Sequence, residues 1–338
     1  MKRFGKLMFG VVAAFAFIAS GQGAWAETSE LRISRGFGIH YLALYVMERQ
    51  RLIEKQAAAA GLGEIKVSWR AIDGGNVIND AMLAGALDIA STGVPGFLTL
   101  WSKAKGNPQI EIIGLGGAGS GSLWLNTRNP NIKTLKDFSD KDRIAVPGIK
   151  TSFAAVVLQM AAAEAFGIEN YAKLDTLTVG ISHPDALAAL ISGKSEINSH
   201  FCSPPFSYLE LDHPGIHRVV NSVDVTGRLT IIMAFTTRAF HDANPKVIKA
   251  FVAALGEATA FIDRNKHEAA RIYIELAKVK ATEADIIRML DDPDTHYTLT
   301  PEGVMKYADF MGRAGTIGTK PGSWKELFTP LVYDRPGS

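Results

Sequence analysis

The stretch MLAGALDIAS, residues 82–91, returns in altered form as LISGKSEINS, residues 190–199. Each copy has apolar residues, a glycine, two spacers, an acidic residue, isoleucine and, two positions later, serine. The two glycines, Gly85 and Gly193, lie 108 residues apart. Glycine is the usual residue just after the end of a helix, and the isoleucine segment that follows is typical of a strand. We therefore expect the chain to build one helix–turn–strand unit twice.

Strand-like and helix-like segments alternate on both sides of Gly121. The expected strands are residues 31–34, 65–72, 87–90, 110–114, 122–127, 143–146, 174–179, 195–198, 219–220 and 230–235. The expected helices are residues 42–56, 77–83, 153–166, 184–191, 246–265, 266–278, 282–290, 301–315 and a short one at 324–328. This alternation predicts an α/β fold with two mostly parallel sheets and flanking helices. Loops at the strand ends of the two lobes would then face each other across a central cleft.

The first 26 residues have the three parts of an export signal. A basic start (Lys2, Arg3, Lys6) precedes an apolar run at 7–19 and the small-x-small site Ala24-Trp25-Ala26. The apolar run is shorter than the roughly 20 residues that span a bilayer, and no cysteine is present there to carry a lipid. We expect cleavage before Glu27 and a periplasmic location.

The composition argues against several classes of function. The signal segment holds three of the 36 basic residues and none of the 34 acidic ones, so the remaining chain is close to neutral. It has no basic stripe of the kind that binds nucleic acid. The histidines, including His213 and His217, have no metal-binding spacing. The single cysteine, Cys202, allows no internal disulfide, and we expect it to be buried rather than reactive. No metal or cofactor is expected.

Residues 114–119 match the G-x-G-x-x-G spacing of dinucleotide-binding loops. That function needs a helix to begin at the glycines, whereas residues 122–127 read as a strand. We interpret the glycines as a hinge between the lobes.

Gly148-Ile-Lys-Thr-Ser152 joins a strand to a helix and is a candidate site for an anion. The free N–H groups and the dipole of a helix start attract negative charge, and Lys150, Thr151 and Ser152 could add hydrogen bonds. The alternative is that the hydroxyls only cap the helix. Phe37, His40 and Tyr41 follow a strand and could form the wall that contacts the rest of an organic ligand.

Taken together, these segments resemble the periplasmic substrate-binding proteins of nitrate/sulfonate/taurine-type ABC transporters. The resemblance covers the chain after the signal segment and rests on the order of degenerate pieces at 31–54, 69–76, 81–95, 132–138, 143–152, 186–206 and 244–251. It implies two α/β lobes joined by two crossing strands. Residues 27–118 with 225–338 would form lobe 1 and residues 119–224 lobe 2.

The resemblance also implies where the ligand-binding loops lie. They correspond to Phe37, Gly38, His40, Tyr41, Gly74, Gly75, Asn76, Gly93, Val94 and Pro95 in lobe 1, and to Lys150, Thr151, Ser152, Phe153, Ser203 and Pro204 in lobe 2. The sequence departs from the family at 140–143, an expected surface turn, and lacks an obvious arginine in the first loops. Arg228 is a weak candidate for that second clamp on an anion.

The expected function is that of a solute-binding protein of an ABC importer. A monomer would close on a small organic, anionic molecule of sulfonate or carboxylate type and deliver it to a membrane permease. Two alternatives stay open: an enzyme on the same fold, similar to desulfinases or pyrimidine-precursor synthases, and a sensory ligand-binding module. A desulfinase would need a nucleophilic cysteine beside its substrate, and residues 35–41 contain none, although Cys202 lies near the loops of lobe 2.

Overall fold

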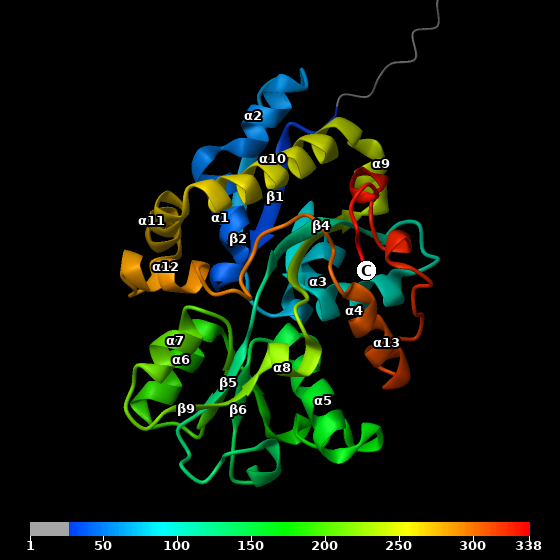
Figure 1. Ribbon diagram of the computed structural model, residues 1–338. Helices are drawn as coiled ribbons and strands as arrows, with labels where there is room; N and C mark the ends of the chain where they lie inside the picture. The colour runs from blue at the N-terminus through cyan, green and yellow to red at the C-terminus, as the bar shows by residue number, and fades with distance from the viewer. Residues whose placement is uncertain (1–26) are drawn as a thin grey trace, which may run out of the picture.

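The computed structural model describes residues 27–338. The predicted export signal lies outside the described residues. The chain forms two α/β lobes, each built around a five-stranded sheet, and Figure 1 shows the larger lobe above the smaller one. Among the described residues, no helix combines the length and the apolar character that a membrane span requires.

The sheet of lobe 1 has the strand order β2-β1-β3-β10-β4. β1 pairs in parallel with β2 and β3, whereas β10 is antiparallel to both β3 and β4. Four strands therefore run in one direction and β10 runs against them. The bounds are β1 Glu30–Arg35, β2 Lys66–Ala71, β3 Ile89–Gly93, β4 Ile112–Ser120 and β10 Thr230–Thr237.

The sheet of lobe 2 repeats this pattern with the order β7-β6-β8-β5-β9. β6 pairs in parallel with β7 and β8, and β5 is antiparallel to β8 and β9. The two sheets thus share one pairing scheme, and β3 and β8 hold the equivalent central place in them. The bounds are β5 Trp124–Thr127, β6 Ile144–Val146, β7 Thr178–Gly180, β8 Ser199–Cys202 and β9 His217–Asn221.

Helices cover both sheets and begin, in several cases, directly after a strand. Those of lobe 1 are α1 Leu42–Gln50, α2 Leu52–Ala59, α3 Gly75–Leu83, α4 Val94–Ala104, α9 Arg238–Ala243, α10 Pro245–Arg264, α11 Lys266–Ala277, α12 Glu283–Leu290 and α13 Val304–Arg313. Those of lobe 2 are α5 Phe153–Phe166, α6 His183–Ser192, α7 Phe206–Leu211 and α8 Ser222–Thr226. The chain enters lobe 2 between β4 and β5 and returns between α8 and β10. The exact lobe boundaries after residues 118 and 224 stay a prediction.

The repeated decapeptide forms the same local structure in both lobes. α3 ends two residues before Gly85 (φ 68°), and the next strand is β3. α6 ends one residue before Gly193 (φ 61°), and the next strand is β8. Both glycines have a left-handed backbone. β8 begins at Ser199, so the strand expected at 195–198 is wrong by a few residues. Just before the strand, the Asn198 side chain accepts the Arg143 N–H and donates to Asp142.

Three further expectations differ from the structure. The helix expected at 42–56 breaks at Arg51, which has a left-handed backbone (φ 52°) between α1 and α2. Residues 175–177 form a 3-10 turn before β7 rather than a longer strand. Residues 114–119 lie inside β4, where every residue is buried, so they are strand and not a loop hinge.

One contiguous cluster of buried apolar side chains extends from lobe 1 into lobe 2. Phe153 at the start of α5 packs at 5.6 Å, ring to ring, on Tyr307 of α13. The lobes are therefore in direct contact.

Candidate functional site: the cavity between the lobes

A small cavity lies where the loops of the two lobes meet. The volume open to the centre of a water molecule is about 40 Å³, enough for a few waters. Most of its lining lies at or just after the carboxyl end of a strand, which is where ligands bind in open α/β sheets. The lining residues are Phe37, His40, Tyr41, Asp73, Gly74, Gly75, Thr92, Gly93, Leu123, Pro147, Ser152, Phe153, Ala154, His183, Ser203, Ile231 and Ile232.

The start of helix α5 supplies hydrogen-bond donors to this cavity. Ser152 is the N-cap, and its hydroxyl accepts the Ala155 N–H at 3.2 Å. The N–H groups of Phe153 and Ala154 make no hydrogen bond with another described residue, as expected for the first turn of a helix. Two backbone donors without partners therefore belong to residues of the cavity lining, at the positive end of a 14-residue helix.

Asp73 is the charged group of the cavity wall. One carboxylate oxygen accepts the Gly74 N–H at 3.1 Å, and the other accepts the His183 N–H across the lobes at 3.3 Å. Burial raises the pKa of Asp73 to about 6, against the opposing effect of these two hydrogen bonds. Among the described residues that line the cavity, Asp73 is the one carboxylate and no lysine or arginine is present. An anionic group would thus be held by helix N–H groups rather than by a cationic side chain.

His40 is a second polar group in the wall. The residue is 1% exposed, and neither ring nitrogen has a hydrogen-bond partner among the described residues. Burial, followed by the nearby His296, lowers the pKa of His40 to about 3. A buried polar group without a partner is costly to the stability of the fold.

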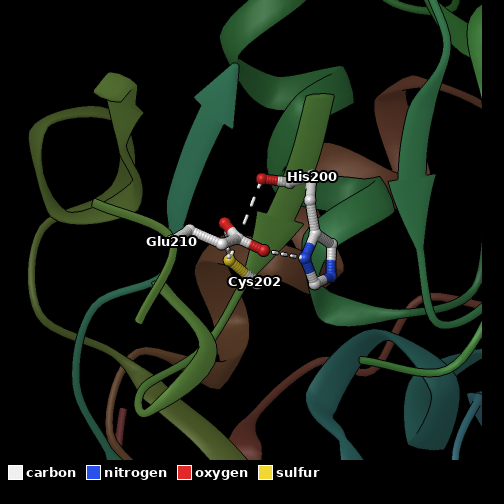
Figure 2. Close-up of side chains that lie close together, drawn as sticks. All are labelled: His200, Cys202 and Glu210. Carbon is white, nitrogen blue, oxygen red and sulfur yellow. Dashed lines mark hydrogen bonds and ion pairs between the residues drawn. The ribbon is translucent and has the colours of Figure 1, made fainter. Parts of the chain in front are cut away.

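A cluster of buried polar side chains lies behind the cavity in lobe 2, formed by Asn126, His200, Cys202 and Glu210. Figure 2 shows the Glu210 carboxylate between the ring of His200 and the sulfur of Cys202. Glu210 is 2.5 Å from His200 Nδ1, 3.1 Å from Cys202 Sγ and 2.9 Å from Asn126 Nδ2. His200, Cys202 and Glu210 each offer a ligand atom within 4.8 Å of the others. Asn126 Nδ2 and Cys202 Sγ donate hydrogen bonds to the same oxygen of the Glu210 carboxylate.

The cavity is closed by direct contacts between the lobes. The Ile39 N–H donates to the Pro204 carbonyl at 2.8 Å. Gly74 has φ 89°, and a Cβ at this position would stand 2.6 Å from the Pro147 carbonyl oxygen. Glycine is therefore required where the loop after β2 meets the loop after β6.

The structure brings together nine of the residues that the sequence proposed for the site. They are Phe37, His40, Tyr41, Gly74, Gly75, Gly93, Ser152, Phe153 and Ser203. The other proposed residues lie outside the lining: Gly38, Asn76, Val94, Pro95, Lys150, Thr151 and Pro204. Lys150 is exposed, and the Thr151 hydroxyl is buried without a partner. Arg228 donates to the Pro293 carbonyl and does not reach the cavity.

Sequence reasoning missed several lining residues. Asp73 and Pro147 directly precede loops that were proposed, so a wider window would have included them. His183 starts α6 and carried no signal beyond its place after a strand. Leu123, Ile231 and Ile232 come from the segments that link the lobes, and nothing local distinguishes them from core residues.

A second and more apolar hollow adjoins the first. Its volume open to a water centre is about 370 Å³, and it lies between α6 and α7 of lobe 2 and the end of α11 in lobe 1. Phe37 lines both spaces. The polar groups and free N–H donors belong to the first space, so we take that cavity as the candidate site.

Comparison with known proteins places this architecture in context. The profile described as the NMT1-like family matches residues 24–278. A search of curated protein sequences finds no match.

Many solved structures share the fold. The alkanesulfonate-binding protein SsuA from Xanthomonas axonopodis pv. citri, bound to MOPS, aligns with a TM-score of 0.66 at 18% identity, covering 87% of this chain and 96% of that one. The periplasmic aliphatic sulphonate binding protein SsuA from Escherichia coli aligns at 0.64 and 19% identity, covering 91% and 100%. The periplasmic nitrate-binding protein NrtA from Synechocystis PCC 6803 aligns at 0.61 and 14% identity, covering 91% and 86%. The chain therefore has the two-lobed periplasmic-binding-protein fold.

Proposed function

The chain belongs to the NMT1-like family, and we propose from this premise that it is the solute-binding component of an ABC importer. It captures one small polar organic molecule in the cavity between the lobes and presents it to a membrane permease. The observation that carries the proposal is the cavity at the strand ends, lined by polar groups of both lobes. Its structural neighbours include sulfonate- and nitrate-binding proteins.

The proposed ligand carries an anionic or strong acceptor group at the start of α5. The unpaired N–H groups of Phe153 and Ala154 support this position, with the Ser152 hydroxyl beside them. The sulfonate or carboxylate type is part of the proposal. The absence of lysine and arginine from the described lining favours a ligand with a single charged group over a multiply charged one.

A cysteine-dependent enzyme fits the structure poorly. Cys202 is fully buried and does not line the cavity. Burial and the neighbouring Glu210 raise the pKa of its thiol well above the usual value, which disfavours the nucleophilic thiolate. This supports binding without chemistry as the proposed activity.

In this proposal the chain is cleaved before Glu27 and works as a monomer in the periplasm. Both walls of the cavity come from one chain, which supports the monomer. Intact mass of protein extracted from cells tests the processing. A mass that includes Met1, or one that includes an acyl chain, would contradict it.

The binding proposal is tested by thermal shift with sulfonates, carboxylates, nitrate and pyrimidines. A specific ligand at 100 times its Kd should raise the free energy of unfolding by about 2.7 kcal/mol. Titration calorimetry would then give the affinity and a stoichiometry of one per chain. The absence of any stabilising compound, with intact folded protein, would count against a solute-binding role.

The anion position is tested by Ser152→Ala with Thr151→Ala as the matched control. Loss of a hydroxyl that bonds a charged group should cost about 1.5–3 kcal/mol, which is about ten- to a hundredfold in Kd. Thr151 lies next in sequence but outside the lining, so its variant should bind within about threefold of the parent. Ser152→Ala should also lower stability by about 0.5–2 kcal/mol through loss of the cap. Lower stability with unchanged affinity would reduce Ser152 to a capping residue.

A further inference from the structure

A chain of hydrogen bonds runs from the buried cluster of lobe 2 to the cavity wall. Glu210 is paired with His200 Nδ1 at 2.5 Å, and His200 Nε2 lies 2.8 Å from His183 Nδ1. His200 and Glu210 are fully buried, whereas His183 lines the cavity. Figure 2 shows the inner half of this chain, the contact between Glu210 and His200. The proposed solute-binding function uses only its outer end.

The hydrogen atoms along this chain can be assigned from its inner end. The second oxygen of Glu210 faces Asn126 Nδ2 and Cys202 Sγ, which are both donors. With Glu210 ionised, both of its oxygens accept hydrogen bonds, and Nδ1 of His200 carries a hydrogen. Asn126 and Cys202 stabilise the carboxylate through these hydrogen bonds. Nε2 of a neutral His200 is then an acceptor.

The position of the ring hydrogen on His183 follows from its position on His200. Since His200 Nε2 accepts, His183 Nδ1 must donate, and the single ring hydrogen of a neutral His183 is used there. Burial first, then the neighbouring His200 and His40, hold the pKa of His183 well below its usual value, which keeps this ring neutral. Its Nε2 makes no hydrogen bond with the described residues and, unlike the nitrogens of His40, is not sealed from open space. The lone pair of Nε2 is left for the cavity.

We propose that Glu210 and His200 are positioning residues that fix His183 as a hydrogen-bond acceptor for the ligand. His183 Nε2 and the Asp73 carboxylate then form an acceptor pair, which takes an N–H or O–H donor group of the ligand such as an amino or amide group. This inference rests on the proposed function and adds a requirement to it. The ligand carries an acceptor or anionic group toward α5 and a donor group toward Asp73 and His183.

The placement of these two residues supports a shared role. The backbone N–H of His183 donates to Asp73 across the lobes at 3.3 Å, so the pair comes together when the lobes are closed. A buried carboxylate and two buried imidazoles are a costly way to fill a core that apolar residues could fill. Setting the hydrogen position on His183 gives them a function at the cavity.

The first experiment measures the ring hydrogens in the ligand-free protein. Long-range 1H–15N correlation spectra of histidine-labelled protein distinguish protonated from unprotonated ring nitrogens, and His183→Gln assigns the signals. We expect the hydrogen of His183 on Nδ1. A hydrogen on His183 Nε2 in the unaltered protein would overturn the proposal, without any variant or ligand.

Glu210→Gln should reverse the direction of the hydrogen bonds that link residue 210, His200 and His183. The amide oxygen of glutamine should face the two donors Asn126 and Cys202, which leaves its NH2 group facing His200 Nδ1. His200 would then carry its hydrogen on Nε2 and donate to His183, whose own hydrogen would move to Nε2. Cys202→Ser is the matched control, because serine keeps a donor to Glu210 and does not touch either ring. An unchanged His183 tautomer in folded Glu210→Gln would also overturn the assignment.

The second experiment compares ligands that differ by one amino group, namely 2-aminoethanesulfonate with ethanesulfonate and 4-aminobenzoate with benzoate. The aminated compound should bind the unaltered protein at least about tenfold more tightly, and this advantage should fall below about threefold in Glu210→Gln. A compound without a donor that binds as well as its aminated partner would overturn the donor requirement while leaving the proposed function intact. Conversely, a protein that binds no small molecule fails the proposed function, whatever its His183 tautomer.

Discussion

Asp73, a buried side chain of the cavity wall, should make the stability of the protein depend on pH. Its pKa is raised from 3.8 to about 6, with burial as the largest cause. The folded state therefore keeps a proton that the unfolded state has already released between about pH 4 and pH 6. Stability is highest below this window and falls as the pH rises through it, by up to about 3 kcal/mol.

Asp73→Asn isolates this effect, because asparagine stays neutral at every pH. Urea unfolding of both proteins between pH 4 and pH 7 should show the unaltered protein losing stability relative to the variant as the pH rises. Taking the difference between the two curves removes the contribution of the other titrating groups. A difference that stays constant over this range would contradict the raised pKa of Asp73.

Cys202 carries a second expectation at the scale of the residue. The thiol is fully buried and donates to Glu210, and its pKa is raised well above the usual value. Cys202→Ser should therefore leave Kd for a ligand within about threefold, since serine retains the donor and the residue does not line the cavity. Titration calorimetry measures this. A hundredfold loss, or covalent labelling of Cys202 that ligand prevents, would instead favour a reactive role.

Glycine at position 117 lets neighbouring backbone pack directly against β4. Gly117 has no room for a side chain, because a Cβ would stand 2.9 Å from the carbonyl oxygens of both Thr298 and Thr300. Gly117→Ala should lower the free energy of unfolding by about 1–3 kcal/mol, the usual cost of overpacking. Gly318→Ala is the control, since its Cβ would meet nothing within 4 Å. Equal stability of the two variants by urea unfolding would contradict the close packing of Thr298 and Thr300 against Gly117.

Sequence patterns predicted elements well where a chemical signal marks their ends. Ser152 and Gly167 flank α5, and the helix was expected with the observed bounds, Phe153–Phe166. Arg51 carries no such signal, because the residue that usually adopts a left-handed backbone is glycine. The start of β8 was likewise unmarked, and the contacts of Asn198 just before it are made with residues that lie 55 and 56 positions away in the sequence.

The candidate site was also predicted only in part from the sequence. Loops that follow strands could be predicted from alternation, and these loops supply most of the lining. Which side chain of each loop faces the cavity depends on the closed arrangement of the lobes, so Ser152 lines it and Thr151 does not. The cluster around Glu210 was not predicted, because its four residues come from β5, β8 and α7 and meet only in the fold.

At the scale of the whole molecule, closure depends on two loops passing each other with little clearance. The Ile39 N–H bonds the Pro204 carbonyl, and the loop after β2 lies against the loop after β6 at Gly74 and Pro147. A binding protein that closes on its ligand loses affinity in proportion to any loss of its closed population. Small changes at these contacts should therefore act on binding more than on the stability of either lobe.

Gly74→Ala tests this with Gly85→Ala as the matched control. Both glycines have a left-handed backbone, at φ 89° and φ 68°, so alanine strains each by about 1–2 kcal/mol. Only at position 74 would the added Cβ also stand 2.6 Å from a carbonyl oxygen of the other lobe, whereas at 85 it would meet nothing within 4 Å.

The contact at position 74 should raise the free energy of the closed form by about 1–3 kcal/mol. The affinity for a ligand found in the screen should then fall by about ten- to a hundredfold in Gly74→Ala, whereas Gly85→Ala should bind within about threefold of the parent. Because Gly74 also lines the cavity, small-angle scattering must accompany the titration: blocked closure should leave ligand-saturated Gly74→Ala with a larger radius of gyration than the parent. Weaker binding with an unchanged radius would assign the effect to direct contact with the ligand and refute steric control of closure at Gly74.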